Sequence, residues 1–124
     1  MIAITKVKCD QIKCIADHFG TSHVLRRAGE EYSEATTAII HYTRASVDLE
    51  GDLHSRKLEL AGELADTLIM LEQLLHVVPD LHRLVASQIA CKVNRTLKRY
   101  DIPTPEVART TSTGARLLTA KEID

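Results

Sequence analysis

The sequence predicts an all-α protein, and three observations lead to this prediction. Aromatic residues make up only 3% of the 124 residues and tryptophan is absent, so the core must be built from Leu, Ile, Val and Ala. Stripes of such side chains suit helix packing better than a β-sandwich. They recur at spacings of three, four and seven, the period of a buried helix face. Glycine and proline then divide the chain into four segments, so we expect a four-helix bundle-like fold.

The first predicted helix covers residues 4–19 and ends at Gly20, because glycine readily takes the positive φ of a helix C-terminus. The second helix begins at Thr21 or Ser22, either of which can cap it, and fades near residues 44–47. Its predicted apolar stripe consists of Val24, Leu25, Ala28, Tyr32, Ala35, Ile39 and Tyr42.

Residues 48–55 (DLEGDLHS) are predicted to form a loop, and the third helix then covers residues 56–78, up to Pro79. Its apolar arc exceeds half of the helix circumference, so we expect burial on two sides, inside a bundle or across a subunit interface. The middle of this arc is formed by Leu60, Leu64, Leu68, Leu71 and Leu75.

The fourth predicted helix covers residues 81–100.

The predicted organisation is one helical domain over residues 1–102, followed by a polar linker or arm over residues 103–124. The formal net charge of −1 argues against a general nucleic-acid binder, which usually shows a basic excess. No run approaches the roughly 18 apolar residues of a membrane span, and lysines occur where a signal peptide would be apolar. The three cysteines are interpreted as reduced thiols. We therefore expect a cytoplasmic protein with no nucleic-acid or membrane partner.

Two pairs of carboxylates are the candidates for a functional site: Glu31 with Glu34, and Glu63 with Asp66. Each pair has the i, i+3 spacing that places both side chains on one helix face, beside an apolar stripe. Antiparallel packing of the two helices would bring four carboxylates together, and a cation would have to compensate their repulsion. Oxygen ligands without a Cys or His cluster favour Mg²⁺, or Mn²⁺, over zinc. A single pair is common on solvated helix faces, so the prediction depends on both.

A basic helix follows the acidic one. Residues 51–80 contain six acids, whereas residues 81–100 contain five Lys or Arg residues and no acid. Lys92 and Arg95 share one face and suit contacts with phosphate groups. A solvated basic face near a helix C-terminus explains them equally well. His23 lies on the polar side of the second helix, near its acids, where it is either close to the site or an ordinary surface or core histidine.

The acidic pattern E-E-x-x-E, a gap, and then E-x-x-D resembles that of the MazG-like all-α nucleoside triphosphate pyrophosphohydrolases, in their short phage and bacterial form. It is carried by the segments Glu30-Glu31-Tyr32-Ser33-Glu34 and Glu63-Leu64-Ala65-Asp66. Residues 16–20, 63–73 and 92–95 also match, and the resemblance covers roughly residues 10–100.

This resemblance implies a helical fold completed by assembly into a homodimer or homotetramer. It implies hydrolysis of an (d)NTP to the (d)NMP and pyrophosphate, a reaction that cleans the nucleotide pool. Some relatives stack the base on a tryptophan, which this chain lacks, so the base stays open. By motif position, Mg²⁺ ligation and catalysis would fall to Glu31, Glu34, Glu63 and Asp66, and substrate binding to Glu30, Lys92 and Arg95.

Other function classes fit the same residues. One is a non-catalytic helical oligomeric module that binds nucleotide or metal, as a sensor or docking unit; another is a purely structural bundle. A narrower alternative is a related enzyme that cleaves another pyrophosphate-containing substrate, such as phosphoribosyl-ATP. Nucleotide turnover separates the enzymes from the module, and an effect of Mg²⁺ on thermal stability separates both from a structural bundle.

Overall fold

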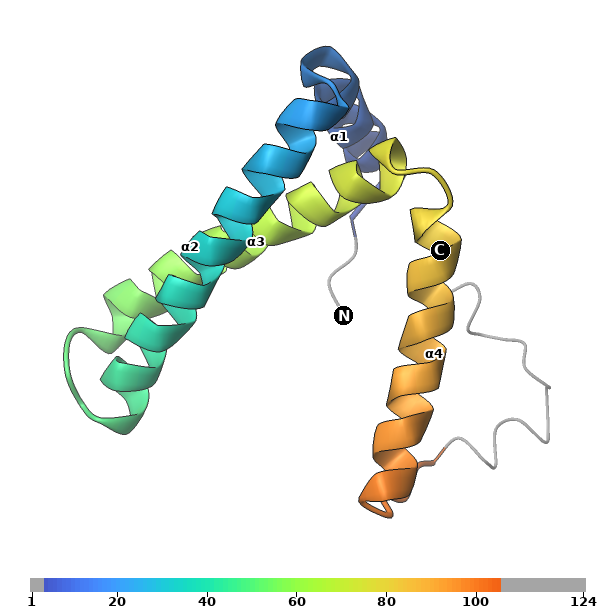
Figure 1. The fold of residues 1–124 in the computed structure, drawn as a ribbon. Helices are drawn as coiled ribbons and strands as arrows, with labels where there is room; N and C mark the ends of the chain where they lie inside the picture. Colours follow the sequence, from blue (N-terminus) through green and yellow to red (C-terminus); the bar gives the residue numbers. More distant parts are fainter. Residues whose placement is uncertain (1–3, 106–124) are drawn as a thin grey trace. The chain divides into compact units, whose positions relative to one another are not determined.

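The computed structural model describes residues 4–105, which form four α-helices and no β-strand. The helices are α1 (Lys6–Phe19), α2 (Thr21–Val47), α3 (Leu53–Val77) and α4 (Leu81–Arg99) (Figure 1). The all-α prediction is confirmed. Contacts group the chain into two units, residues 1–85 and 86–124, so the boundary falls within α4.

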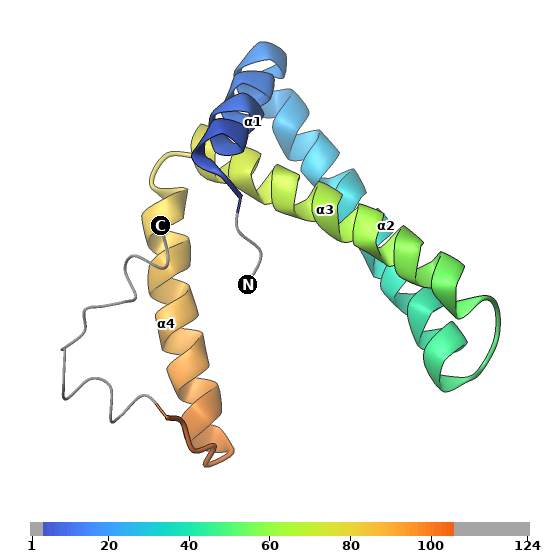
Figure 2. The same ribbon diagram turned by 180° about the vertical axis from the view of Figure 1, so that it is seen from behind.

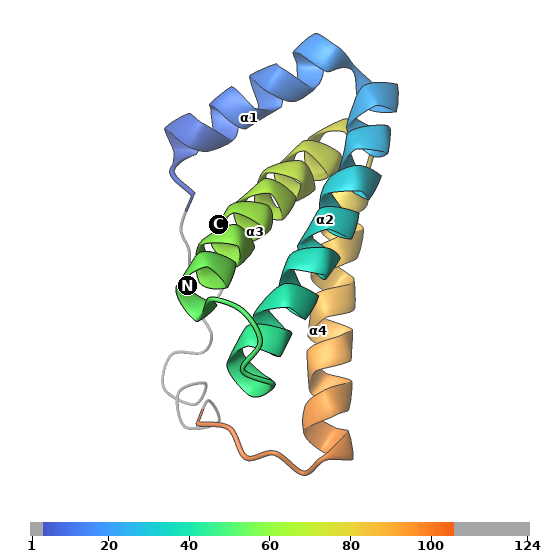
Figure 3. The ribbon, with the colours of Figure 1, turned by 90° about the vertical axis from the view of Figure 1, so that its left-hand side faces the viewer.

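The first unit contains a hairpin of α2 and α3, which run side by side in opposite directions (Figure 1, Figure 2). The α1 helix packs where α2 begins and α3 ends (Figure 3). The buried cluster at this meeting point contains Ala16 of α1, Val24 and Ala28 of α2, and Met70 of α3. Three helices therefore share one small apolar core, which lies close to the predicted carboxylates.

Local signals explain where the helices begin and end. Thr5 caps α1, because its hydroxyl accepts the backbone N–H of Lys8 at 3.2 Å. Gly20, with φ of 91°, ends α1 and allows α2 to start at once. Asp52 accepts the N–H of His54, so α3 begins three residues before the predicted position, and the loop before it is shorter than predicted.

The buried face of α2 differs from the predicted stripe. Leu25, Tyr32 and Ile39 were expected inside, but 51%, 41% and 49% of their surface is exposed. The small alanines face the rest of the unit instead, because they let α2 approach α3 closely. The bulky side chains lie at the edges of this helix contact. We call this buried face the seam of α2; its members are Val24, Ala28, Glu31, Ala35, Ala38 and Ala45.

The buried line of α3 is also displaced from the middle of its leucine arc. Thr67, Met70 and Gln73 are buried, whereas Leu64 is 42% exposed. Leu68 and Leu71 are half-buried. The contact with α2 and α1 therefore follows one edge of the arc, the edge on which Glu63 lies.

None of the residues of α4 is buried, and its apolar side chains Leu84, Ile89 and Val93 are about half exposed. No helix within residues 4–105 is long and apolar enough to cross a membrane. The predicted arm, residues 103–124, lies outside the described residues from residue 106 onward.

Candidate metal centre

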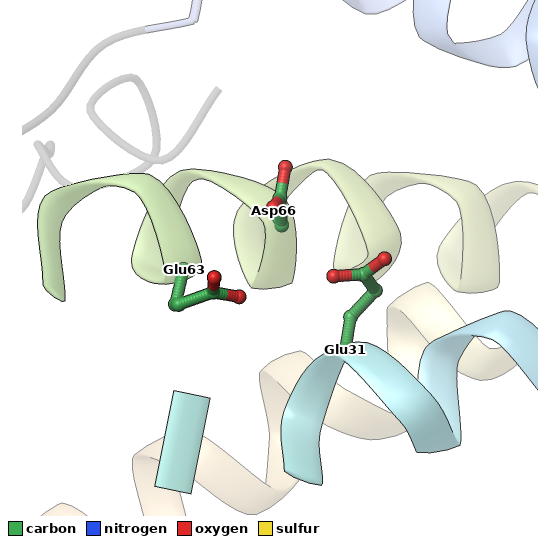
Figure 4. Close-up of side chains that lie close together, drawn as sticks. All are labelled: Glu31, Glu63 and Asp66. Carbon is green, nitrogen blue, oxygen red and sulfur yellow. The ribbon is translucent and has the colours of Figure 1, made fainter. Parts of the chain in front are cut away.

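Three of the predicted carboxylates converge between α2 and α3. Glu31 reaches from α2 towards α3, and Glu63 of α3 points towards it, with Asp66 one turn along (Figure 4). One carboxylate oxygen from each of the three lies within 4.8 Å of the others. The antiparallel packing of α2 and α3 therefore brings Glu31 to the pair Glu63 and Asp66, whereas Glu34, the fourth carboxylate expected there, is not part of the group.

The seam of α2 explains why these side chains meet. Glu31 occupies a seam position between Ala28 and Ala35, so the backbones on either side of it can approach α3 closely. Glu63 lies one turn before the buried Thr67, on the edge of α3 that faces this seam. A carboxylate at each facing position leaves acidic side chains where the helix period would otherwise place core residues.

Burial raises the pKa values of two carboxyl groups of the cluster, those of Glu31 and Glu63. Only 6% of Glu31 is exposed, and this burial raises the pKa of its carboxyl group. The nearby Arg27 acts in the opposite direction, and the charges of Asp66 and Glu34 add to the increase. Burial also raises the pKa of Glu63, with the charges of Glu34, Asp66 and Glu59 adding to it. The free cluster therefore holds negative charge at an energetic disadvantage.

One oxygen of this cluster lacks a hydrogen-bond partner within the described part of the chain. Oε1 of Glu63 is buried and has no hydrogen-bond partner among the described residues. An unpaired buried acceptor is unfavourable, and native proteins rarely keep one without a reason. This oxygen could serve as a ligand for a hard divalent cation, since Mg²⁺ prefers a few carboxylates and retains water at its other positions. The donor set therefore fits Mg²⁺ or Mn²⁺.

A cation from the chain already reaches one of the carboxylates. The guanidinium of Arg27 forms an ion pair with Glu31, and a second one with Glu30 at 2.8 Å. Arg27 was not among the predicted site residues, although its position three and four residues before two acids is the spacing of helical ion pairs.

The other predicted site residues lie in different surroundings. Glu34 is exposed and stands outside the group of three, although its charge affects the pKa values of Glu31 and Glu63. Glu30 forms an ion pair with Arg27 and is not part of the group of three. Lys92 and Arg95 are exposed on α4, in the second unit, so their contact with phosphate stays a prediction.

A pocket of about 290 Å³ adjoins the carboxylates within the first unit. Glu31, Asp66 and Arg27 form one part of its wall. The rest is mostly apolar and comes from α1, α2 and α3. His23, for which a position near the acids was one of the expectations, lines this pocket. The other lining residues are Ile15, Phe19, Ile69, Met70 and Gln73.

Comparisons of the chain with protein-family models, with curated proteins and with solved structures found no match. The resemblance to MazG-like enzymes therefore depends on the acidic pattern of the sequence. The position of Glu31, Glu63 and Asp66 is an independent observation about the same residues.

Proposed function

We propose that this protein is a Mg²⁺-dependent nucleoside triphosphate pyrophosphohydrolase of the MazG-like type. One observation carries the proposal: the side chains of Glu31, Glu63 and Asp66 meet, and Oε1 of Glu63 is buried there without a partner within residues 4–105. The acidic pattern supports the proposal from the sequence, and the pocket beside the carboxylates supports it by offering room for the organic part of a substrate.

In this function Glu31, Glu63 and Asp66 would hold Mg²⁺, and Glu34 would lie beside them at the exposed edge. Mg²⁺ would supply polarisation of the phosphate oxygens and would make a nearby water more acidic. In the proposed reaction the oxygen of an attacking water would form a bond to the α-phosphorus, the bond from this phosphorus to the α–β bridging oxygen would break, and pyrophosphate would leave. The carboxylate of Glu34 is the exposed base that would accept the proton of the water.

Positive charge is needed where the phosphates lie. Arg27 supplies it at the pocket wall, next to Glu31. Lys92 and Arg95 are the basic residues that the resemblance assigns to the same task. Guanidinium groups suit this role because they donate two parallel hydrogen bonds to phosphate oxygens.

We propose further that the protein acts as a homodimer or homotetramer. Large apolar side chains are exposed on all four helices, among them Val7, Ile39, Leu58 and Ile89. Such surface on helices favours association with another helical surface.

The test is a panel of all ribo- and deoxyribonucleoside triphosphates with Mg²⁺, with pyrophosphate release as the readout. At least one nucleotide should be cleaved, and Asp66→Asn should reduce the rate by at least about 100-fold, more than the loss usual for residues that only support a metal ligand. Glu72→Gln is the matched control, since Glu72 is an acid of the same helix outside the cluster. A folded protein that releases no pyrophosphate from any nucleotide would refute the proposal.

The second candidate function is a non-catalytic module that binds nucleotide or metal. The ion pair of Arg27 with Glu31 favours it, because a cation of the chain already compensates part of the charge. Tight nucleotide binding without turnover would support this alternative.

A further inference from the structure

We propose that the pocket beside the carboxylates binds the nucleobase of the substrate, with Phe19 and His23 stacking on the ring and Gln73 hydrogen bonding to its edge. This inference rests on the proposed function and identifies the residues of this chain that would choose the base. All three residues line the same pocket as Glu31 and Asp66.

Two aromatic rings stack at the junction of α1 and α2. The rings of Phe19 and His23 lie nearly parallel, with an angle of 18° and a distance of 4.5 Å between their centroids. Phe19 is the chain's only phenylalanine, and it is 54% exposed. An exposed aromatic ring in a pocket wall offers a flat apolar surface, and a planar base extends such a stack favourably.

The same pocket also contains a polar side chain. Gln73 lines the pocket and is only 6% exposed, so its side chain is held at the pocket wall. Its amide has both a donor and an acceptor to offer. The edge of a nucleobase presents donors and acceptors side by side, which an aliphatic or lipid ligand does not. The pocket therefore suits a flat ring with a polar edge.

The size of the pocket and its connection to the carboxylates limit which part of a substrate it can hold. Its volume of about 290 Å³ is near the lower limit of the roughly 300–1,000 Å³ typical of small-molecule pockets. This space suits a base with part of its sugar and is small for a complete triphosphate. Because Glu31 and Asp66 belong both to the pocket and to the carboxylate cluster, the phosphates would leave the pocket on the side where a metal ion would bind.

Calorimetric titration with AMP, GMP, CMP and UMP in Mg²⁺ buffer tests the proposal, with ribose 5-phosphate as the ligand that lacks a base. At least one nucleotide should bind roughly ten-fold or more tightly than ribose 5-phosphate, as expected for one stacked base. Phe19→Leu should remove most of this preference and leave ribose 5-phosphate binding unchanged. Gln73→Met, which keeps the side-chain size but removes the amide, should change the order of the four bases. Leu58→Ala is the control, since Leu58 is exposed and outside the pocket lining.

Equal binding of ribose 5-phosphate and all four nucleotides would overturn the inference. So would normal base preference in folded Phe19→Leu and Gln73→Met proteins. These results are separate from the fate of the proposed function. Turnover without base preference would reject the pocket assignment alone, whereas base-dependent binding without pyrophosphate release would reject the enzyme and keep the pocket.

Discussion

At the scale of single residues, the unusual feature is a charged side chain in a seam of alanines. Glu31 is buried between Ala28 and Ala35, where the helix period calls for an apolar residue. Its charge is offset by Arg27, while Glu63 opposite has an oxygen with no partner in the part of the chain that the structure describes. Proteins accept such local conflicts at functional sites, so the position of Glu31 is itself an argument for a role beyond packing.

Arg27 and a bound metal ion would compete for the same carboxylate. We expect Arg27→Gln to lower the melting temperature without metal, because it leaves buried Glu31 with less compensation. The same change should increase the affinity for Mg²⁺ roughly three- to ten-fold, since a neighbouring positive charge is removed. Thermal unfolding with and without Mg²⁺ measures both effects. Arg26→Gln is the matched control, and an unchanged Mg²⁺ affinity in Arg27→Gln would contradict the idea of competition.

At the scale of the elements, the pairing of α2 and α3 depends on close approach along the seam of α2. Ala38 is fully buried there, with 0% of its surface exposed. Away from the carboxylate cluster, a polar contact joins the same two helices, because His41 of α2 donates a hydrogen bond to Glu59 of α3 at 2.9 Å. Small residues and polar contacts such as this one therefore hold the hairpin that positions the site.

A larger side chain in the seam should separate the two helices. We expect Ala38→Leu to destabilise the fold by about 1–3 kcal/mol, the usual effect of extra methylenes in a packed core. The same residue on the exposed side, as in Thr37→Leu, should change the free energy of unfolding much less. Denaturant unfolding measures both. If Ala38→Leu were as stable as the natural chain, close approach along the seam would not be the feature that holds the hairpin.

The contact between Glu59 and His41 should make stability depend on pH on the acid side. Hydrogen bonds from His41 and Arg56 lower the pKa of Glu59 below its ordinary value of 4.5. Because the folded state then binds this proton less tightly than the unfolded state, the stabilisation is present above about pH 4.5 and is lost as the pH falls through the folded pKa.

We therefore expect Glu59→Gln to lower the melting temperature at about pH 7, and the difference from the natural chain to disappear towards about pH 3. Melting curves of the two proteins over this range measure the difference. Glu50→Gln serves as the control, because Glu50 is exposed and forms no ion pair among the described residues. A difference that stays constant with pH would show that the contact does not act through the charge of Glu59.

At the scale of the whole molecule, the sequence predicted the helices better than their faces. Gly20 and Pro79 stand beside helix ends, because glycine and proline act on the backbone locally. The choice between Leu25 and Ala28 for the buried side of α2 could not be predicted, because it depends on how closely α3 approaches.

Part of the candidate site could likewise be predicted from the sequence, and part could not. The convergence of Glu31, Glu63 and Asp66 followed from helical spacing and antiparallel packing. The pocket did not, because Phe19 and Gln73 come from helices distant in sequence, and no local pattern connects them.

The exposed apolar surface leads to the last prediction. A helix of 19 residues gains most of its stability from burying an apolar face, yet α4 has no buried residue among those described. We expect light scattering after size-exclusion chromatography to give two or four times the mass of one chain. Replacing Ile89 and Val93, which lie one turn apart and are 57% and 51% exposed, by lysine should shift the protein towards the monomer. Replacing Gln88 and Asn94 by lysine adds the same two charges at exposed polar positions and should leave the assembly intact. A natural chain that stays monomeric at all concentrations would contradict the proposed oligomer, and equal effects of the two changes would show that charge rather than lost apolar contact separates the subunits.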